Sequence, residues 1–349
     1  MKKNLIIFFI FVIIVLVTFS FIKREKNKEI GLDSIRIGWQ TAWAPQAQLV
    51  QVLKHTDILE KNGLFGEFKG FSYGGPLNEA ALAGEVDIIF TADFPAINLL
   101  SKSDNWVIVS RLIDFRGGII VPKDSSFQVI SDLKGKVISS PFGSAIHLYA
   151  LSYIKDQGFD VKKEFKIEHL DFGEQLSVVQ KGTSESFGNI SAFISADPPM
   201  ALGEADGKIR ILKPLSPQSF VVMSTNFINQ NPKAAEKFIR SFIESYYYYS
   251  KNQSLANEWF RQEAKKDLSD AILNQTSSLE KNLQVGNIKD IDVSINEERV
   301  VQLDKIINEA VENDLLKQTF DIRKRIDLKI IKEAKKNNLE FDLDQVKVK

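Results

Sequence analysis

Short apolar runs alternate with helix-like segments from Ile35 to Ser224, and this alternation strongly constrains the fold. The runs have the length of strands, and glycine or proline bounds several of them. Strands that alternate with helices favour an α/β sheet with right-handed crossovers, because each crossover uses the intervening helix. We therefore expect an α/β fold. The predicted strands are 35–39, 68–73, 86–90, 106–110, 119–122, 137–140, 166–170, 190–194 and 220–224.

The pattern changes to helices after Pro232. Asn231 followed by Pro232 is typical of a helix start. Apolar side chains then recur at helical spacing, and the tyrosines at 246–249 are expected to pack beneath this helix. Residues 296–316 predict a further helix. The basic segment 322–334 predicts a solvated closing helix.

An apolar run, Leu5–Ile22, lies near the N-terminus between lysine and arginine residues. It is long for the core of a signal peptide and near the lower limit for a membrane-spanning helix. We expect an uncleaved membrane anchor with its linker over residues 1–31, and a cleaved signal segment is the alternative. The flanking charges alone favour a body on the cytoplasmic side.

Composition excludes several classes of function. The 349 residues include 45 basic and 45 acidic ones, so there is no basic field to attract nucleic acid. The absence of cysteine excludes disulfides, thiolate metal sites and cysteine nucleophiles. The three histidines are not spaced as a helical metal pair. We expect no cofactor and no metal.

The segment Val137–His147 predicts a strand, a tight Pro/Gly turn and a helix start. Such a junction directs backbone N–H groups, a hydroxyl and the positive helix end at one point, which suits an anionic ligand group. Ser144 is expected to cap the helix, with His147 three residues later. A Ser/His pair suggests nucleophilic catalysis, but both residues lie in one turn and no orienting acid is evident. We expect no catalytic role.

Three more segments follow predicted strands at the edge where open α/β sheets bind ligands. In Trp39–Pro45, Trp43 is expected to face a cleft and Trp39 the core, because Trp39 continues the strand alternation. Gly74-Gly-Pro76 either lets a ligand approach the backbone closely or forms a simple turn.

The third segment is Thr91–Pro95. Asp93 either caps the helix at Pro95 or receives a ligand amine, and capping is the more common role of such an aspartate. Thr91 and the nearby N–H groups are available to a ligand in both cases.

Five segments are more specific together than any one alone. They are Ser72-Tyr-Gly-Gly-Pro-Leu-Asn-Glu-Ala-Ala-Leu-Ala-Gly-Glu-Val-Asp87, Thr91-Ala-Asp-Phe-Pro95, Asp132-Leu-Lys-Gly-Lys136, Gly143-Ser-Ala-Ile-His147 and Gly188-Asn-Ile-Ser-Ala-Phe-Ile-Ser-Ala-Asp-Pro198. They resemble the aliphatic sulfonate, taurine and nitrate substrate-binding proteins of ABC transporters. The resemblance runs from about Ile35 to Leu212 and does not include the apolar N-terminal run.

The resemblance implies a type II periplasmic-binding-protein fold, with two α/β lobes that close about a two-strand hinge. Lobe one is then 32–116 with 217–349, lobe two is 117–216, and the crossings fall near 115–118 and 213–217. It places Asp197 at the cleft of the second lobe. The ligand contacts expected on this basis are Gln40, Trp43, Gly75, Thr91, Ala92, Asp93, Gly143, Ser144, Ala145, His147 and Asp197.

The sequence departs from the family pattern around its last segment. Ser191 replaces a usual aspartate, while Ala196 and Pro199 replace the usual large aromatics, and residues 183–188 are an apparent insertion. Smaller side chains predict a roomier or differently shaped cleft, so the ligand is not copied from the relatives. Arg116 beside the hinge either adds charge to the cleft or lies on the solvated surface.

The resemblance implies an extracytoplasmic solute-binding receptor of an ABC importer, in the periplasm or at the cell surface, tethered or secreted. It would capture a small anionic or polar ligand such as a sulfonate, taurine or nitrate, without chemistry, and dock on a permease with its ATPase. A monomer is expected. One alternative is a thiamine-pyrimidine-related binding protein or enzyme of the same fold, which the missing cysteines and the apolar N-terminal run disfavour. Another is a ligand sensor that acts with a separate signalling partner.

Overall fold

The computed structural model describes residues 31–336 and 340–349. The predicted membrane segment, Leu5–Ile22, lies outside these residues. Within the described ranges, no helix is long and apolar enough to cross a membrane.

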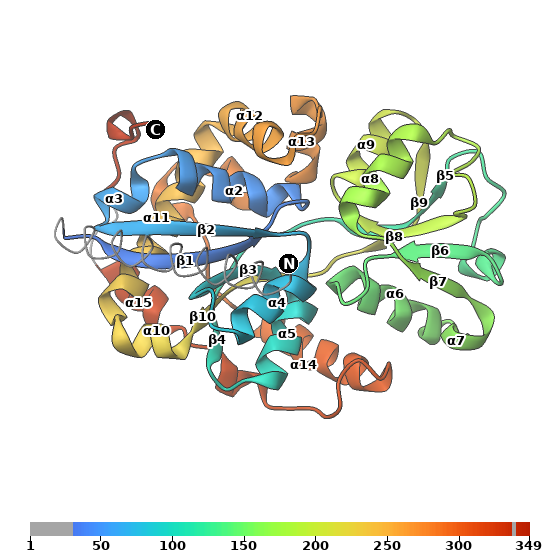
Figure 1. Ribbon diagram of the computed structural model, residues 1–349, viewed down its shortest axis with the longest axis horizontal. Helices are drawn as coiled ribbons and strands as arrows, with labels where there is room; N and C mark the ends of the chain where they lie inside the picture. Colours follow the sequence, from blue (N-terminus) through green and yellow to red (C-terminus); the bar gives the residue numbers. More distant parts are fainter. Residues whose placement is uncertain (1–30, 337–339) are drawn as a thin grey trace, which may run out of the picture.

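The chain folds into two α/β lobes, each built around a five-stranded mixed sheet (Figure 1). The sheet of lobe one has the order β2-β1-β3-β10-β4, in which β1 pairs in parallel with β2 and β3, and β10 pairs antiparallel with β3 and β4. Its strands are β1 (Asp33–Gln40), β2 (Leu64–Phe71), β3 (Ile88–Ala92), β4 (Trp106–Arg111) and β10 (Ser219–Ser224).

The sheet of lobe two has the order β7-β6-β8-β5-β9, in which only β5 runs antiparallel to its two neighbours. Its strands are β5 (Gly117–Pro122), β6 (Val137–Ser140), β7 (Lys166–His169), β8 (Ala192–Ala196) and β9 (Ile209–Leu215). The predicted strands are all present, with bounds that differ by a few residues. Strand β9 was not predicted: it contains Lys213 and Pro214, which an edge strand tolerates because one side of it makes no ladder bonds.

Helices cover both faces of each sheet (Figure 1). Those of lobe one are α2 (Ala44–His55), α3 (Ile58–Lys61), α4 (Gly74–Leu82), α5 (Asp93–Lys102), α10 (Thr225–Gln230), α11 (Pro232–Lys251), α12 (Gln253–Ala264), α13 (Asp270–Thr276), α14 (Glu297–Glu312) and α15 (Lys329–Lys336). Those of lobe two are α6 (Ala145–Asp156), α7 (Val161–Glu164), α8 (Phe172–Lys181) and α9 (Pro199–Ala205). Short 3-10 turns lie at 130–133, 281–284, 288–290, 322–325 and 343–345.

The C-terminal helices complete the core of lobe one. Helix α11 starts at Pro232, and its own Tyr246, Tyr248 and Tyr249 are buried against the core, as predicted, whereas Tyr247 is only partly buried. The prediction of one solvated helix over 322–334 is wrong: a 3-10 turn precedes α15, which packs against α11. Three apolar side chains of α15 are buried on one face while its lysines point outward, so the basic composition concealed a packing face.

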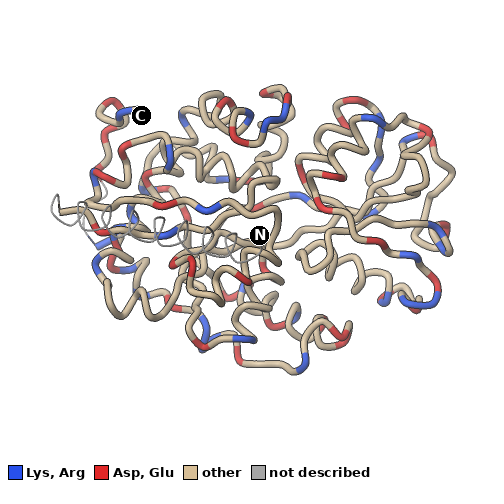
Figure 2. The backbone as a smooth tube through the Cα atoms, viewed as in Figure 1, with Lys and Arg blue, Asp and Glu red and all other residues tan. Residues whose placement is uncertain are grey.

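Two segments of chain join the sheets, 112–116 between β4 and β5 and 216–218 between β9 and β10. Gly117–Gly118 and Lys213–Leu215, which belong to the predicted crossings, are paired residues of β5 and β9. Acidic and basic side chains are interspersed over both lobes (Figure 2).

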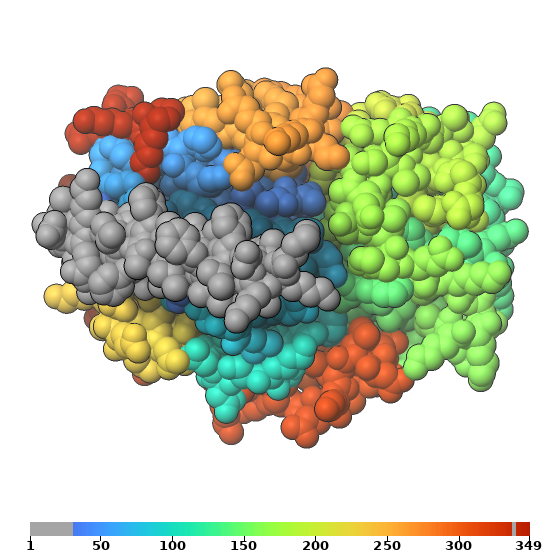
Figure 3. Space-filling model, in the orientation of Figure 1, coloured from blue at the N-terminus to red at the C-terminus, as the bar shows by residue number. Residues whose placement is uncertain are grey.

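The lobes also touch each other away from the connecting segments (Figure 3). Helix α9 of lobe two packs against α13, and α6 packs against α5 and α14. The two lobes therefore contact each other through these helices as well as through the connecting segments.

Candidate ligand-binding site

Two helix starts of lobe one lie side by side where α6 of lobe two packs against α5. A Cβ atom on Gly74 would lie 2.8 Å from Pro95 and 3.7 Å from Thr91 Oγ1, so the starts of α4 and α5 are adjacent. From lobe two, Tyr149 of α6 reaches Asp93 at the start of α5. Backbone N–H groups in the first turn of a helix have no partner inside the helix, so the starts of α4 and α6 are suited to anionic or polar groups. At α5 the Asp93 N–H donates to the Gln218 carbonyl, the Phe94 N–H donates to Asp93 Oδ1, and Pro95 has no N–H.

Two buried donors near these helix starts have no partner. Thr91 is fully buried, and its Oγ1 makes no hydrogen bond within the described chain. Trp43, which precedes α2, is 4% exposed, and its Nε1 is equally unpaired among the described residues. Its ring packs on Phe115 of the first connecting segment, with centroids 4.4 Å apart. A buried polar group without a partner costs about 1–3 kcal/mol, and a hydrogen bond to a ligand atom would offset this cost.

Trp39 is also buried with an unpaired Nε1, but it lies elsewhere. Its ring is beneath Lys54, near the end of α2, with the ammonium 5.4 Å from the ring centroid. Trp39 and Trp43 therefore occupy opposite ends of α2.

Gln40 helps to fix the loop that carries Trp43 through hydrogen bonds. Its Nε2 donates to the Phe90 carbonyl at 3.5 Å, and its backbone N–H donates to Gln46 Oε1 at 3.3 Å. Gln46 Nε2 donates in turn to the Trp43 carbonyl at 3.2 Å. Gln46 was not among the predicted site residues. It is a buried glutamine in the first turn of α2, next to the predicted contact Trp43.

Gly75 lies in the first turn of α4 and allows a close side-chain contact. A Cβ atom there would lie 2.8 Å from the ring of Tyr73. The Tyr73 ring approaches lobe two, where its centroid is 5.8 Å from that of His169.

Asp93 is the first residue of α5, with Ala92 in the N-cap position. Its Oδ1 accepts from Phe94 N at 2.7 Å, and its Oδ2 accepts from Gln218 N at 2.7 Å and from Tyr149 Oη at 2.8 Å. Burial raises the pKa of Asp93 to about 6, although these three donors favour the ionised form. The Asp93 carboxylate already accepts three hydrogen bonds from the chain, so it is not free to accept from a ligand. It also does not cap a helix that starts at Pro95, because α5 starts at Asp93 itself.

In lobe two, Gly143 adopts φ +76° before the start of α6. Ser144 caps the helix, its Oγ accepting from His147 N at 3.3 Å, and Ala145 is buried behind it. The His147 ring pairs instead with Ser140 on β6, where Nδ1 and Oγ lie 2.7 Å apart. Ser140 is fully buried, so this pair offers substrate no nucleophile.

Burial, together with a smaller effect of the neighbouring His169, lowers the pKa of His147 to about 4. The imidazole is therefore neutral at pH 7. The ring also packs against Phe142, whose centroid is 4.9 Å away.

Asp197 directly follows β8 and is bound by Arg116 of the first connecting segment. Arg116 Nε and Nη2 donate to its two oxygens, each at 2.8 Å, and Ala201 N donates to Oδ1 at 3.0 Å. Arg116 Nη1 also donates to Glu204 of α9 at 2.9 Å. Arg116 is thus part of an ion-pair network and not a solvated surface residue.

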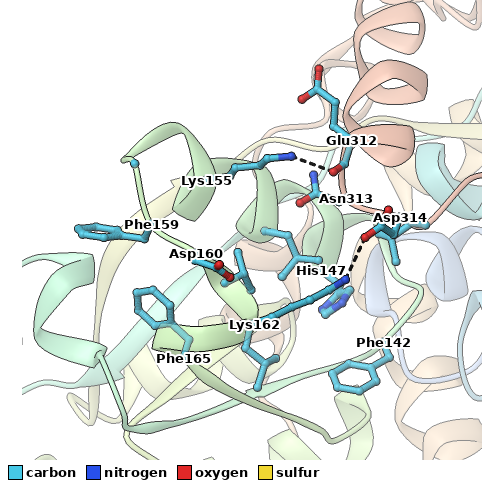
Figure 4. Close-up of a pocket in the computed structure, with 15 residues that line it drawn as sticks. Phe142, His147, Lys155, Phe159, Asp160, Lys162, Phe165, Glu312, Asn313 and Asp314 are labelled. Carbon is cyan, nitrogen blue, oxygen red and sulfur yellow. Dashed lines mark hydrogen bonds and ion pairs between the residues drawn. The ribbon is translucent and has the colours of Figure 1, made fainter.

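A groove of 920 Å³ begins beside His147 and runs along α6 (Figure 4). Leu151, Phe159 and Phe165 form much of its apolar wall. At its rim, Lys155 Nζ donates to the Glu312 carbonyl at 2.8 Å and Lys162 pairs with Asp314 at 2.9 Å. His147 is the one predicted contact that lines it.

Residues 74–198 match the family model described as "ABC transporter, phosphonate, periplasmic substrate-binding protein". No curated protein matches the sequence.

Solved structures share the fold. The alkanesulfonate-binding protein SsuA from Xanthomonas axonopodis pv. citri, bound to MOPS, is 17% identical with a TM-score of 0.69, covering 84% of this chain and 98% of that one. The aliphatic sulphonate-binding SsuA from Escherichia coli is 19% identical with a TM-score of 0.66, covering 84% and 97%. The nitrate-binding NrtA from Synechocystis PCC 6803 is 14% identical with a TM-score of 0.63, covering 89% and 91%. The chain has the periplasmic-binding-protein fold, and its resemblance to the sulfonate- and nitrate-binding proteins of ABC transporters is confirmed.

Proposed function

We propose that this chain is an extracytoplasmic solute-binding receptor of an ABC importer that captures a small anionic or polar ligand between its lobes. The closed form would dock on a permease that works with an ATPase. The family match, the fold and the two-lobed arrangement support this function. The lobe boundaries at 116/117 and 216/217, the tether at the N-terminus and the monomeric state remain predictions.

The observation that carries the proposal is the pair of unpaired buried donors, Thr91 Oγ1 and Trp43 Nε1, which lie just before α5 and α2 of lobe one. Donors without acceptors favour a ligand with exposed oxygen atoms. The two buried carboxylates nearby, Asp93 and Asp197, already accept hydrogen bonds from the chain. This disfavours recognition through an ammonium group.

We place the ligand head between Thr91 and Trp43 on lobe one and the start of α6 on lobe two, at Gly143–Ser144. Gln40 would hold the loop of Trp43, while Gly75 and Ala92 would offer backbone close to the ligand. Mechanistically, the ligand enters an open cleft and the lobes close over it about the connecting segments. Binding, with no bond made or broken, is the whole activity proposed.

A thermal-shift screen of sulfonates, taurine, nitrate, bicarbonate and pyrimidines tests the function, because a ligand that binds only the folded state raises its stability. The expected result is concentration-dependent stabilisation without product formation. Product formed from a stabilising compound would instead favour an enzyme.

The two tryptophans offer a matched test of the site. Trp43→Phe and Trp39→Phe each remove one buried, unpaired indole N–H, but only Trp43 lies at the proposed site. Trp43→Phe is expected to raise the Kd about tenfold, the loss of one hydrogen bond to a charged group, and Trp39→Phe to leave it unchanged. The double variant Ser144→Ala/Trp43→Ala should abolish ligand-induced stabilisation. Equal Kd values for the two Trp→Phe variants would refute the site.

A further inference from the structure

One carboxylate oxygen joins both lobes beside the candidate site. Asp93 Oδ2 accepts from Tyr149 Oη of lobe two at 2.8 Å and from Gln218 N in the second connecting segment at 2.7 Å. Gln302 Nε2, on α14 of lobe one, donates to Tyr149 Oη at 2.8 Å. Tyr149 is the member of this network that lies on lobe two, so rotating lobe two away must break both of its bonds.

The same face of α6 makes further contacts with lobe one. Tyr149, Ser152 and Lys155 are spaced by three residues and lie on one side of the helix. Asn313 Nδ2 donates to Ser152 Oγ at 3.3 Å. Lys155 Nζ donates to the Glu312 carbonyl, as Figure 4 shows. The Asp93–Tyr149 bond is the most buried of these contacts, because Asp93 is fully buried whereas Lys155 is exposed.

We infer that Asp93 and Tyr149 form a latch that holds the two lobes closed, so that both residues set ligand affinity without touching the ligand. This inference rests on the proposed function. The apparent Kd of a receptor whose closed state binds is the intrinsic Kd divided by the closed fraction. A phenol bonded to a buried carboxylate is a charge-assisted hydrogen bond, so its loss lowers the ratio of closed to open molecules.

The distance between the lobes can be measured without a ligand. The described chain has no free cysteine and the full sequence contains none, so one cysteine in each lobe suffices for paired spin labels. Glu79 on α4 and Lys181 on α8 are exposed positions for Glu79→Cys and Lys181→Cys. In this background, Tyr149→Phe is expected to lower the closed-to-open ratio about tenfold.

Two further variants sharpen the test. Gln302→Ala removes the second bond to the Tyr149 hydroxyl from outside the buried core and should shift the ratio in the same direction. Tyr153→Phe is the matched control: it lies on the same helix, and its hydroxyl makes no hydrogen bond within the part of the chain that the structure describes. It should leave the distance distribution unchanged.

With a ligand from the screen, the Kd should rise by the factor by which each variant lowers the closed fraction. Distances that are the same in the wild-type protein, Tyr149→Phe and Gln302→Ala overturn the latch, whether or not a ligand is known. If the variants shift the distances but no compound in the screen stabilises the protein, the latch is supported and only the proposed function is contradicted.

Discussion

Arg116 holds Asp197 in a two-point ion pair, with Nε to Oδ2 and Nη2 to Oδ1 both 2.8 Å apart. The carboxylate is fully buried, and the guanidinium side chain is 18% exposed. The pair joins the first connecting segment to the end of β8, and Glu204 and Gln275 extend it to α13 of lobe one.

Arg116→Ala is expected to destabilise the protein by about 3–5 kcal/mol, because it leaves a buried carboxylate without its partner. The free energy of unfolding in urea measures this. Lys162→Ala is the control, since Lys162 and its partner Asp314 are exposed and such a pair contributes little. Equal effects of the two substitutions would contradict the role given to Arg116.

His147 should make the protein less stable in acid. Its folded-state pKa of about 4 lies below the ordinary value of 6.5, so the unfolded chain takes up this proton first. Stability from this residue is present above pH 6.5 and is lost as the pH falls toward 4, by about 3 kcal/mol in total. Urea unfolding between pH 4 and 7 should show a smaller pH slope in His147→Gln. An unchanged pH slope would contradict the lowered pKa of His147.

Asp93 should act in the opposite direction. Its folded-state pKa of about 6 lies above the ordinary 3.8, so its contribution is present below pH 3.8 and is lost as the pH rises through 6, by about 3 kcal/mol. The difference in unfolding free energy between the wild-type protein and Asp93→Asn should therefore fall over this range. Only the slope is diagnostic, because the substitution also removes hydrogen bonds. A difference that stays constant with pH would exclude the shift.

Gly75→Ala should weaken ligand binding several-fold with little change in stability. The new Cβ atom would meet the Tyr73 ring at 2.8 Å and displace it, while alanine in a helix offsets part of the strain. Calorimetry gives the Kd and urea unfolding the stability. Adding Tyr73→Ala removes the clash, so the double variant should bind no worse than Tyr73→Ala alone. A further loss in the double variant would show that Gly75 contributes by another route.

The element types were largely predictable because most strands are apolar runs bounded by turn residues, which give a local signal. Strand β9 was not, since Lys213 and Pro214 interrupt its pattern and only edge pairing with β5 makes it a strand. The buried face of α15 was missed for a related reason: its lysines dominated the composition while its apolar spacing went unused.

Local sequence also indicated the helix starts of the site, including Ser144 as a cap. It did not indicate the hydrogen-bond partners of the side chains at these helix starts. Asp93 is paired with Tyr149, which lies in the other lobe, and His147 is paired with Ser140 and not with Ser144. Such pairings depend on which residues the fold brings together, so the spacing of residues along the sequence does not determine them.

The place of β10 bears on the order in which the chain is made. During synthesis on the ribosome, β4 leaves the exit tunnel before any strand of lobe two. Strand β10, which lies between β3 and β4 in the sheet, begins only at Ser219. Lobe two is one uninterrupted stretch and has its complete sheet by Leu215. Strand β10, which is synthesised after lobe two, therefore completes the sheet of lobe one. Lobe two starts to be synthesised second but is able to complete its sheet first.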